Sequence, residues 1–146
     1  MTIERAGLDD LAEIMPLFCD YLRFYEAPVD LARATAFVSD RLGGESVFYV
    51  ARAPHEAVAF AHLFPAYATL AQRTMWILED LFVTPRARGA GIATGLLERA
   101  EAHARASGAL RLQLVTAKSN HLAQRTYERS GWKRDDRFVT YEREIA

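Results

Sequence analysis

The sequence contains little of several features, and each shortage excludes a class of protein. Cys19 is the only cysteine, so no disulfide can form within the chain. Because Cys19 lies in an apolar helical pattern, we expect a buried small side chain rather than a nucleophile. The net charge is only −1, which gives no bulk attraction to nucleic acids or anionic membranes. We therefore expect neither as a partner.

Long apolar runs are also missing. No stretch approaches the roughly 18 apolar residues that a membrane span needs. The first residues, MTIERAGLDDLAE, contain acids and lack the apolar segment of a signal peptide. These two observations predict a soluble, cytoplasmic protein. The histidines show no metal-ligand spacing, so no bound metal is predicted.

The composition that is present is typical of one globular domain. The chain has 146 residues, of which 51% are hydrophobic, and a chain of this length can bury a single core. No internal repeat of roughly 20 to 50 residues marks a solenoid. We therefore predict a single domain over residues 1–146.

Hydrophobic periodicity predicts a mixed α/β fold. Strands are expected at 2–5, 46–53, 57–65, 74–83, 110–116 and 138–145. Helices are expected from Asp9 or Asp10 to about Tyr25, and at 30–42, 90–107 and 120–130. Pro16 should kink or divide the first helix. Residues 54–56 form a tight connection between two strands, so we expect a hairpin and a largely antiparallel central sheet flanked by helices.

The most informative stretch is residues 78–97, LEDLFVTPRARGAGIATGLL, in which an apolar strand leads through a glycine-containing turn into a helix. The N–H groups at a helix start have no partner within the helix and carry the positive end of its dipole, so such a turn binds phosphate oxygens. Gly89 and Gly91 permit positive φ angles and a close approach of ligand to backbone. Arg86 and Arg88 add positive charge.

The spacing Arg86-x-x-Gly89-x-Gly91, directly after the strand residues EDLFV, resembles the acetyl-CoA signature of the Gcn5-related N-acetyltransferases, the GNAT superfamily. The later segment 120–127 also fits that family. The resemblance implies the GNAT acyl-CoA N-acyltransferase fold, acetyl-CoA as a cosubstrate that donates the acetyl group, and a homodimer.

A dinucleotide-binding fold is the rival interpretation of this turn, since Gly89-x-Gly91-x-x-x-Gly95 looks superficially like its fingerprint. That fingerprint should follow the first strand, and the next strand should end in an acid about 20 residues later. Residues 112–118 contain no acid. The context therefore disfavours this fold.

The resemblance also implies which residues bind the cosubstrate. Its pyrophosphate would contact main-chain amides of Arg88, Gly89, Ala90, Gly91, Ile92, Ala93 and Thr94. Its pantetheine arm would pair along Leu81, Phe82 and Val83. Asn120 would help to anchor that arm.

Glu79 is the leading candidate for the base that deprotonates the acceptor amine. The chain resembles the diamine and spermidine/spermine N-acetyltransferase branch through LEDLFV and the segment Phe24-Tyr25-Glu26, and in that branch the matching Glu lies beside the amine. A single carboxylate is a weak base, so we expect the proton to leave through ordered water. A solvated acid at the strand end is the alternative interpretation.

Strand alternation predicts that Glu79, Leu81 and Val83 share one face of their strand and that Asp80 and Phe82 share the other. The two neighbouring acids therefore cannot share a role. For Asp80 we expect a solvated acid or the partner of an arginine.

Tyr127 is the candidate acid, because the family pattern brings the hydroxyl of this tyrosine to the cosubstrate sulfur. It could then protonate the leaving thiolate. Tyr25 and Glu26 are candidates to hold a cationic acceptor by ring face and carboxylate. Core packing for the tyrosines and a solvated acid for Glu26 stay open as alternatives.

Together these features indicate an acetyl-CoA-dependent N-acetyltransferase in which a small-molecule primary amine attacks the thioester directly. A di- or polyamine or an amino acid would suit, although Arg86 departs from the polyamine branch and leaves the amine's length and charge open. Three alternatives remain. The acceptor is a protein N-terminus or lysine, or the chain is a non-catalytic acyl-CoA-binding regulatory module, which would need neither Glu79 nor Tyr127. The third is a structural interaction domain without a cofactor.

Overall fold

In the computed structural model, all residues from 1 to 146 are described. They divide into two compact units, Met1–Val115 and Thr116–Ala146, and each is described by itself below. The first unit contains the whole sheet and three of the α-helices, and the second contains the fourth.

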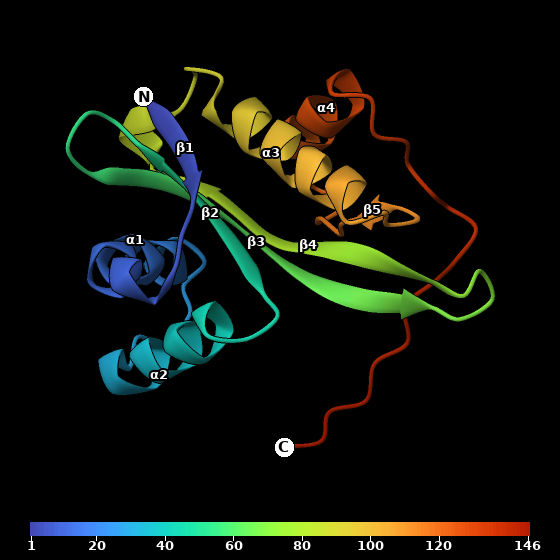
Figure 1. Cartoon of the computed structure of the whole chain (residues 1–146), viewed down its shortest axis with the longest axis horizontal. Coiled ribbons are helices and arrows are strands. Elements are labelled where there is room, and N and C mark those ends of the chain that lie inside the picture. The colour runs from blue at the N-terminus through green and yellow to red at the C-terminus, as the bar shows by residue number, and fades with distance from the viewer. The chain divides into compact units, whose positions relative to one another are not determined.

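The sheet of the first unit has five strands in the order β1-β2-β3-β4-β5 (Figure 1). Their bounds are Thr2–Arg5 for β1, Val47–Arg52 for β2, Ala57–Ala68 for β3, Arg73–Val83 for β4 and Leu112–Gln113 for β5. Every neighbouring pair is antiparallel except β4 with β5, which are parallel. The predicted hairpin joins β2 to β3, where Ala53 N donates to Glu56 O. The predicted mixed α/β fold with a largely antiparallel sheet is confirmed.

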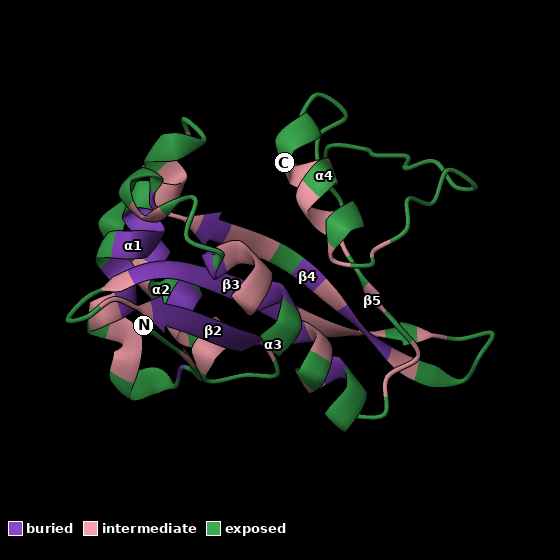
Figure 2. Cartoon of the chain, turned by 90° about the horizontal axis from the view of Figure 1, so that it is seen from above, coloured by how far each residue is buried: buried purple, intermediate pink, exposed green.

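Helices cover both faces of this sheet (Figure 1). α1, Leu11–Phe24, and α2, Leu31–Leu42, lie against one face, and α3, Ile92–Ala106, lies against the other. Two short 3-10 helices, η1 at Leu8–Asp10 and η2 at Pro85–Ala87, precede α1 and α3. Figure 2 shows the strands β2 and β3 as the most continuously buried part of the unit.

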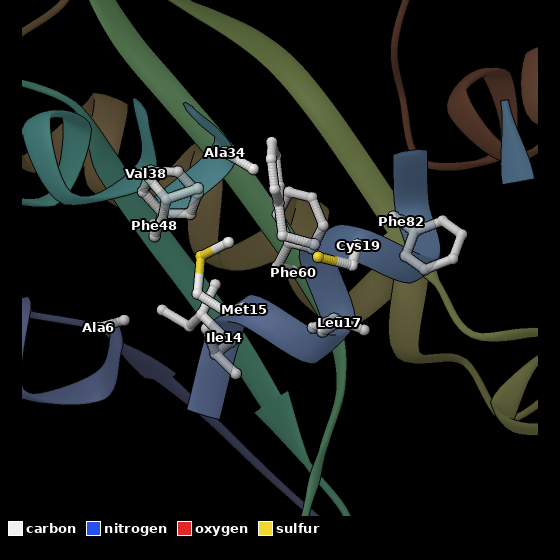
Figure 3. Close-up of a cluster of buried hydrophobic side chains, with 12 residues drawn as sticks. Ala6, Ile14, Met15, Leu17, Cys19, Ala34, Val38, Phe48, Phe60 and Phe82 are labelled. Carbon is white, nitrogen blue, oxygen red and sulfur yellow. The ribbon is translucent and has the colours of Figure 1, made fainter. Parts of the chain in front are cut away.

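The core between α1, α2 and the sheet combines aromatic side chains from the strands with apolar side chains from α1 (Figure 3). Phe48 and Phe60 are 1% and 0% exposed, with ring centroids 6.1 Å apart. Ile14 and Met15 of α1 pack in the same cluster. Cys19 is buried, as predicted. Burial of each large apolar side chain contributes about 1.5–3 kcal/mol, so this cluster fixes α1 on the sheet and thereby positions the tyrosines near its C-terminus.

α1 is continuous although Pro16 lies in its second turn. A proline inside a helix removes one N–H donor, and the effect on hydrogen bonding is local. Ile14, Leu17 and Phe18 are buried at helical spacing around it, and their packing holds both parts of the helix against the sheet. The predicted division of the helix at Pro16 is therefore not found.

The second unit consists of α4, His121–Arg129, followed by a segment without helix or strand. The strand predicted at 138–145 is not formed. A strand requires ladder hydrogen bonds to a neighbour, and the sheet contains no strand from this segment. Its large apolar residues, Phe138, Val139, Tyr141 and Ile145, are 76% to 91% exposed.

β5 is also shorter than the predicted 110–116, since only Leu112 and Gln113 pair with β4. This shortness matters for the site, because it leaves much of β4 without a neighbour on that side. None of the helices is both long enough and apolar enough to cross a membrane.

Candidate active site

The C-terminal part of β4 has a neighbouring strand on one side only. β3 pairs with β4 up to Val83, whereas β5 pairs only with the middle of β4. Thr84 N donates to Val58 O on the β3 side, and the main-chain groups of successive strand residues point to alternate edges. The N–H and C=O groups of Val83 and Leu81 therefore face the open edge, where an extended ligand can pair as an added strand would.

The turn that follows β4 presents free N–H groups. Gly89 and Gly91 have φ angles of 83° and 77°, a region that costs a residue with a Cβ roughly 1–2 kcal/mol. Gly91 is the N-cap of α3, and no side chain caps this helix. None of the main-chain N–H groups of residues 89–94 donates a hydrogen bond within the protein. Together with the helix dipole, they form the anion-binding turn that the sequence predicts.

Protein groups already engage the two arginines of the motif. Arg86 forms an ion pair with Glu56, at 2.7 Å between Nη2 and Oε1. Arg88 Nε donates to the main-chain oxygen of Val83 at 3.0 Å, and its guanidinium lies 4.6 Å from the ring centroid of Phe24. The anion-binding capacity therefore rests on the N–H groups of the turn. The contact also shows that the Val83 carbonyl faces the free edge, where Arg88 already donates to it.

A pocket of about 440 Å³ opens beside the turn. It is lined by Asp20, Arg23, Phe24, Phe82, Thr84, Pro85 and Arg86. Thr84 is 3% exposed, and its hydroxyl has no hydrogen-bond partner. A buried polar group without a partner costs about 1–3 kcal/mol, so a ligand that reaches this hydroxyl would relieve that cost.

Glu79 lies at a β-bulge. The pairing of β3 with β4 changes register between His62 and Leu63, and Glu79 is the residue of β4 left without a partner. An extra residue interrupts the alternation of side chains along a strand, so the predicted common face of Glu79 and Leu81 does not follow across the bulge. Glu79 is exposed and forms no hydrogen bond or ion pair.

Asp80 is not the solvated acid or arginine partner that the sequence suggests. Its Oδ1 accepts a hydrogen bond from the hydroxyl of Tyr21 at 2.5 Å, and its Oδ2 lies 2.9 Å from His62 Nδ1. The side chain of Asp80 is only 16% exposed. The register of the sheet explains this contact, because Asp80 pairs with His62 across the ladder and both side chains project from the α1 face.

Tyr21 connects this buried group to the predicted acceptor residues. Burial, then the hydrogen bond to Asp80 and the charges of Asp80, Tyr25 and Glu79, raise the pKa of Tyr21 well above its usual range. The ring of Tyr21 also contacts the ring of Tyr25, at 5.2 Å between centroids. Sequence reasoning misses Tyr21 and His62. The one signal for His62 is its position two residues after the core aromatic Phe60 on β3, which places both side chains on the same face of the strand.

Tyr25 and Glu26 follow the end of α1. Tyr25 is 58% exposed, and its ring meets that of Tyr21 edge-on at 5.2 Å between centroids. Glu26 is exposed and has a φ of 56°. Such a conformation is uncommon for a residue other than glycine, and it often occurs at functional sites.

Asn120 and Tyr127 both belong to the second unit. The Asn120 side chain accepts a hydrogen bond from Ala123 N at 3.2 Å and so caps α4. Tyr127 lies in the last turn of α4, with its ring 6.1 Å from that of Trp132. The predicted contacts of Asn120 and Tyr127 with the cosubstrate stay predictions.

The first unit thus combines an anion-binding turn, an open strand edge with amide groups, and a pocket containing an unpartnered hydroxyl. These groups fit a ligand that carries a diphosphate on an extended amide-containing arm, as coenzyme A does. No cluster of three or more His, Cys, Asp or Glu side chains is arranged to hold a metal ion.

Comparisons with known proteins show the family to which the chain belongs. Residues 11–132 match the sequence profile of the acetyltransferase (GNAT) family. The uncharacterized N-acetyltransferase YhfO of Bacillus subtilis (strain 168) is 39% identical over 142 residues, which cover 97% of this chain and 95% of YhfO. A crystal structure of a probable acetyltransferase is 34% identical, with a TM-score of 0.93 over 100% of this chain and 99% of the other.

More distant structures share the fold alone. The ribosomal-protein-alanine N-acetyltransferase of Brucella melitensis biovar Abortus 2308 is 18% identical, with a TM-score of 0.82 over 99% of this chain and 100% of the other. The chain therefore belongs to the GNAT family and is an N-acetyltransferase, and its family implies acetyl-CoA as the cosubstrate.

Proposed function

We propose that this N-acetyltransferase transfers the acetyl group of acetyl-CoA directly to the primary amine of a small molecule, with Glu79 as the base and Tyr127 as the acid. The observation that carries the proposal is the setting of Glu79, an exposed carboxylate at a bulge of β4 with no cationic partner. Bulges frequently occur next to active sites, where they redirect a side chain. A carboxylate without a cation is available to accept the proton of an ammonium group.

In the proposed reaction the amine nitrogen attacks the thioester carbonyl carbon. A C–N bond forms, the C–S bond breaks, and no acyl-enzyme forms. The amine proton goes to Glu79 through ordered water, and the thiolate takes a proton from the hydroxyl of Tyr127. A main-chain N–H at the open edge, such as that of Val83, stabilises the negative charge that develops on the carbonyl oxygen.

The acceptor amine is proposed to lie against Tyr25 and Glu26, which offer a ring face and a carboxylate to a cation. The neighbouring pocket is lined by Arg23, Arg86 and Asp20. Arg23 pairs with Asp20, and Arg86 pairs with Glu56. These ion pairs leave no unpaired charge in the pocket that selects between acceptors, so a di- or polyamine and an amino acid are both proposed as acceptors.

Steady-state kinetics with a panel of amino acids, diamines, polyamines and aminoglycosides tests this proposal by following thiol release. Glu79→Gln should lower kcat about 10²–10⁴-fold, the usual contribution of a general base. Glu98→Gln is the matched control, because Glu98 on α3 is also exposed and forms no ion pair. It should leave kcat unchanged.

Tyr127→Phe should lower kcat in the same panel, whereas Tyr141→Phe, at a tyrosine that is 91% exposed, should not. Near-normal turnover in both Glu79→Gln and Tyr127→Phe would remove the proposed roles. If only peptides were acetylated, the acceptor would be a protein N-terminus or lysine and the proposal of a small-molecule amine would fail.

We further propose a homodimer in the cytoplasm, on the strength of the family resemblance and of the sequence features described first. Analytical ultracentrifugation at micromolar concentration tests the assembly. A monomer across the concentration range would contradict it.

A further inference from the structure

Three hydrogen bonds link four polar side chains across the α1 face of the sheet. Tyr21 OH donates to Asp80 Oδ1 at 2.5 Å, Asp80 Oδ2 lies 2.9 Å from His62 Nδ1, and His62 Nε2 lies 3.0 Å from Ser46 Oγ. His62 is 4% exposed, and its ring stacks on that of Phe48 at 4.4 Å between centroids. The packing holds the imidazole in one orientation, so the chain of hydrogen bonds is fixed from Ser46 to Tyr21.

The directions of these hydrogen bonds follow from the donors available. An ionised Asp80 is only an acceptor, so Tyr21 O–H and His62 Nδ1–H both donate to it. In a neutral imidazole Nε2 is then the acceptor, and Ser46 O–H donates to it. Every proton in the chain therefore points toward Asp80. A phenol has only one hydrogen, so the Tyr21 oxygen can only accept from any further partner.

The ring of Tyr21 lies against the ring of Tyr25, one of the predicted acceptor residues. Nothing in the protein donates a hydrogen bond to this oxygen. The rings of Tyr21, Tyr25, Phe24 and Phe82 contact one another in a closed circuit, at 5.1 Å to 5.8 Å between centroids. The high pKa of Tyr21, caused first by burial and next by the bond to Asp80, keeps the phenol protonated.

We propose that Tyr21 is an acceptor-binding residue whose oxygen accepts an N–H of the amine, and that Asp80 and His62 are positioning residues that fix this polarity. The inference rests on the function proposed above and adds a contact to it. The contact would also make the acceptor site select groups that donate a hydrogen bond over groups that only accept one. An amine or ammonium satisfies an oxygen that can only accept, whereas an ether or a carboxylate oxygen at the same place leaves it unpaired.

A purely structural role is the competing explanation, in which the chain only satisfies a buried histidine. The two explanations differ in what the loss of one hydroxyl does. Tyr21→Phe keeps the ring and its aromatic contacts, so a structural role predicts a modest loss of stability and unchanged kinetics. The proposed role predicts a change in the Michaelis constant for the amine.

The test measures KM for the amine, KM for acetyl-CoA and kcat with the acceptor that the panel identifies. Tyr21→Phe should raise KM for the amine about tenfold to a hundredfold, as expected for the loss of a hydrogen bond to a charged group. It should leave KM for acetyl-CoA unchanged. Tyr49→Phe is the control, because Tyr49 is buried on the opposite face, against His103 and Arg99 of α3.

A matched pair at His62 tests the positioning role. His62→Leu removes the donor to Asp80 and should raise KM for the amine in the same way, and His62→Asn, whose amide can donate to Asp80, should restore most of it. The effects of Tyr21→Phe and His62→Leu should not add, because both act on one contact. A structural role would lower the melting temperature of both His62 variants and leave KM unchanged.

The tautomer of His62 provides a readout that does not depend on any variant folding. Nitrogen-15 NMR of the wild-type imidazole should show Nδ1 protonated and Nε2 bare, and the reverse tautomer would overturn the inference. An amine KM within twofold of wild type in Tyr21→Phe would also overturn it. If kcat of Glu79→Gln were still lowered as expected, the proposed function would stay intact. If the wild-type protein acetylated no amine, the proposed function would fail and this inference with it.

Discussion

Replacing Gly91 by alanine tests the account of the anion-binding turn. Gly91 has φ 77° and ψ 11°, and an added Cβ would meet nothing within 4 Å. The cost of the substitution is therefore conformational rather than steric. An L-residue in the left-handed region costs roughly 1–2 kcal/mol. A change of 1 kcal/mol lowers the melting temperature of a domain of this size by about 2–4 °C, so we expect a decrease of about 2–8 °C.

The same substitution should weaken the binding of coenzyme A about tenfold or more. Alanine favours a negative φ, which turns the N–H groups around Gly91 away from a common point. Denaturant unfolding measures the stability, and titration calorimetry measures the affinity. Gly7→Ala is the control, because Gly7 has a φ of −125° and equally empty surroundings. It should change stability by less than about 0.5 kcal/mol.

Wild-type stability together with wild-type affinity in Gly91→Ala would show that neither the positive φ of Gly91 nor the N–H groups around it matter for binding. A loss of stability with unchanged affinity would support the conformational cost of alanine at position 91. It would also mean that the diphosphate binds elsewhere.

Three further predictions concern other parts of the chain. Burial, and next the charge of Arg5, lower the pKa of His103 in the folded protein. The imidazole therefore binds a proton more readily in the unfolded state. The free energy of unfolding should then fall as the pH drops below about 6.5. His103→Gln should reduce that slope in unfolding curves, and an unchanged slope would contradict the assignment. Asn120→Ala should destabilise α4 by about 1 kcal/mol, because the helix loses its N-cap. Asn120→Asp should keep the cap. Hydrogen exchange of the α4 amides measures both effects. Glu26→Gly should raise the free energy of unfolding by up to about 1 kcal/mol, because glycine adopts the positive φ without strain. It should also raise KM for the amine, because the carboxylate is lost. Glu26→Gln should raise KM for the amine and leave the free energy of unfolding unchanged.

The sequence predicts those parts of the fold that depend on local patterns. The apolar spacing of α1 and α3 and the runs of β2 to β4 predict the elements to within a few residues, because each pattern matches the period of its element. The turn around Gly89 and Gly91 is predicted for a similar reason, since the positive φ angles and the start of the helix are both determined by neighbouring residues in the sequence. The strand expected at 138–145 has the right pattern but no neighbour, and pairing is not a local property.

The site shows the same division between local and long-range features. Glu79 and Asp80 are adjacent in a strand, so alternation predicts opposite faces, but the bulge is fixed by the pairing of β3 with β4 and is not visible in β4 alone. The bond from Tyr21 to Asp80 joins residues 59 positions apart. Only the packing of α1 on the sheet brings them together, so no spacing in the sequence could have indicated it.

Binding of acetyl-CoA by this protein depends first on the contact between its diphosphate and the free N–H groups that follow β4. Amide NMR spectra of the nitrogen-15-labelled protein, recorded during titration with coenzyme A and in parallel with adenosine, test it directly. Coenzyme A should shift the amides of residues 89–94 most, together with that of Val83, and adenosine should leave residues 89–94 unchanged. Unchanged amides at 89–94 at saturating coenzyme A would contradict it.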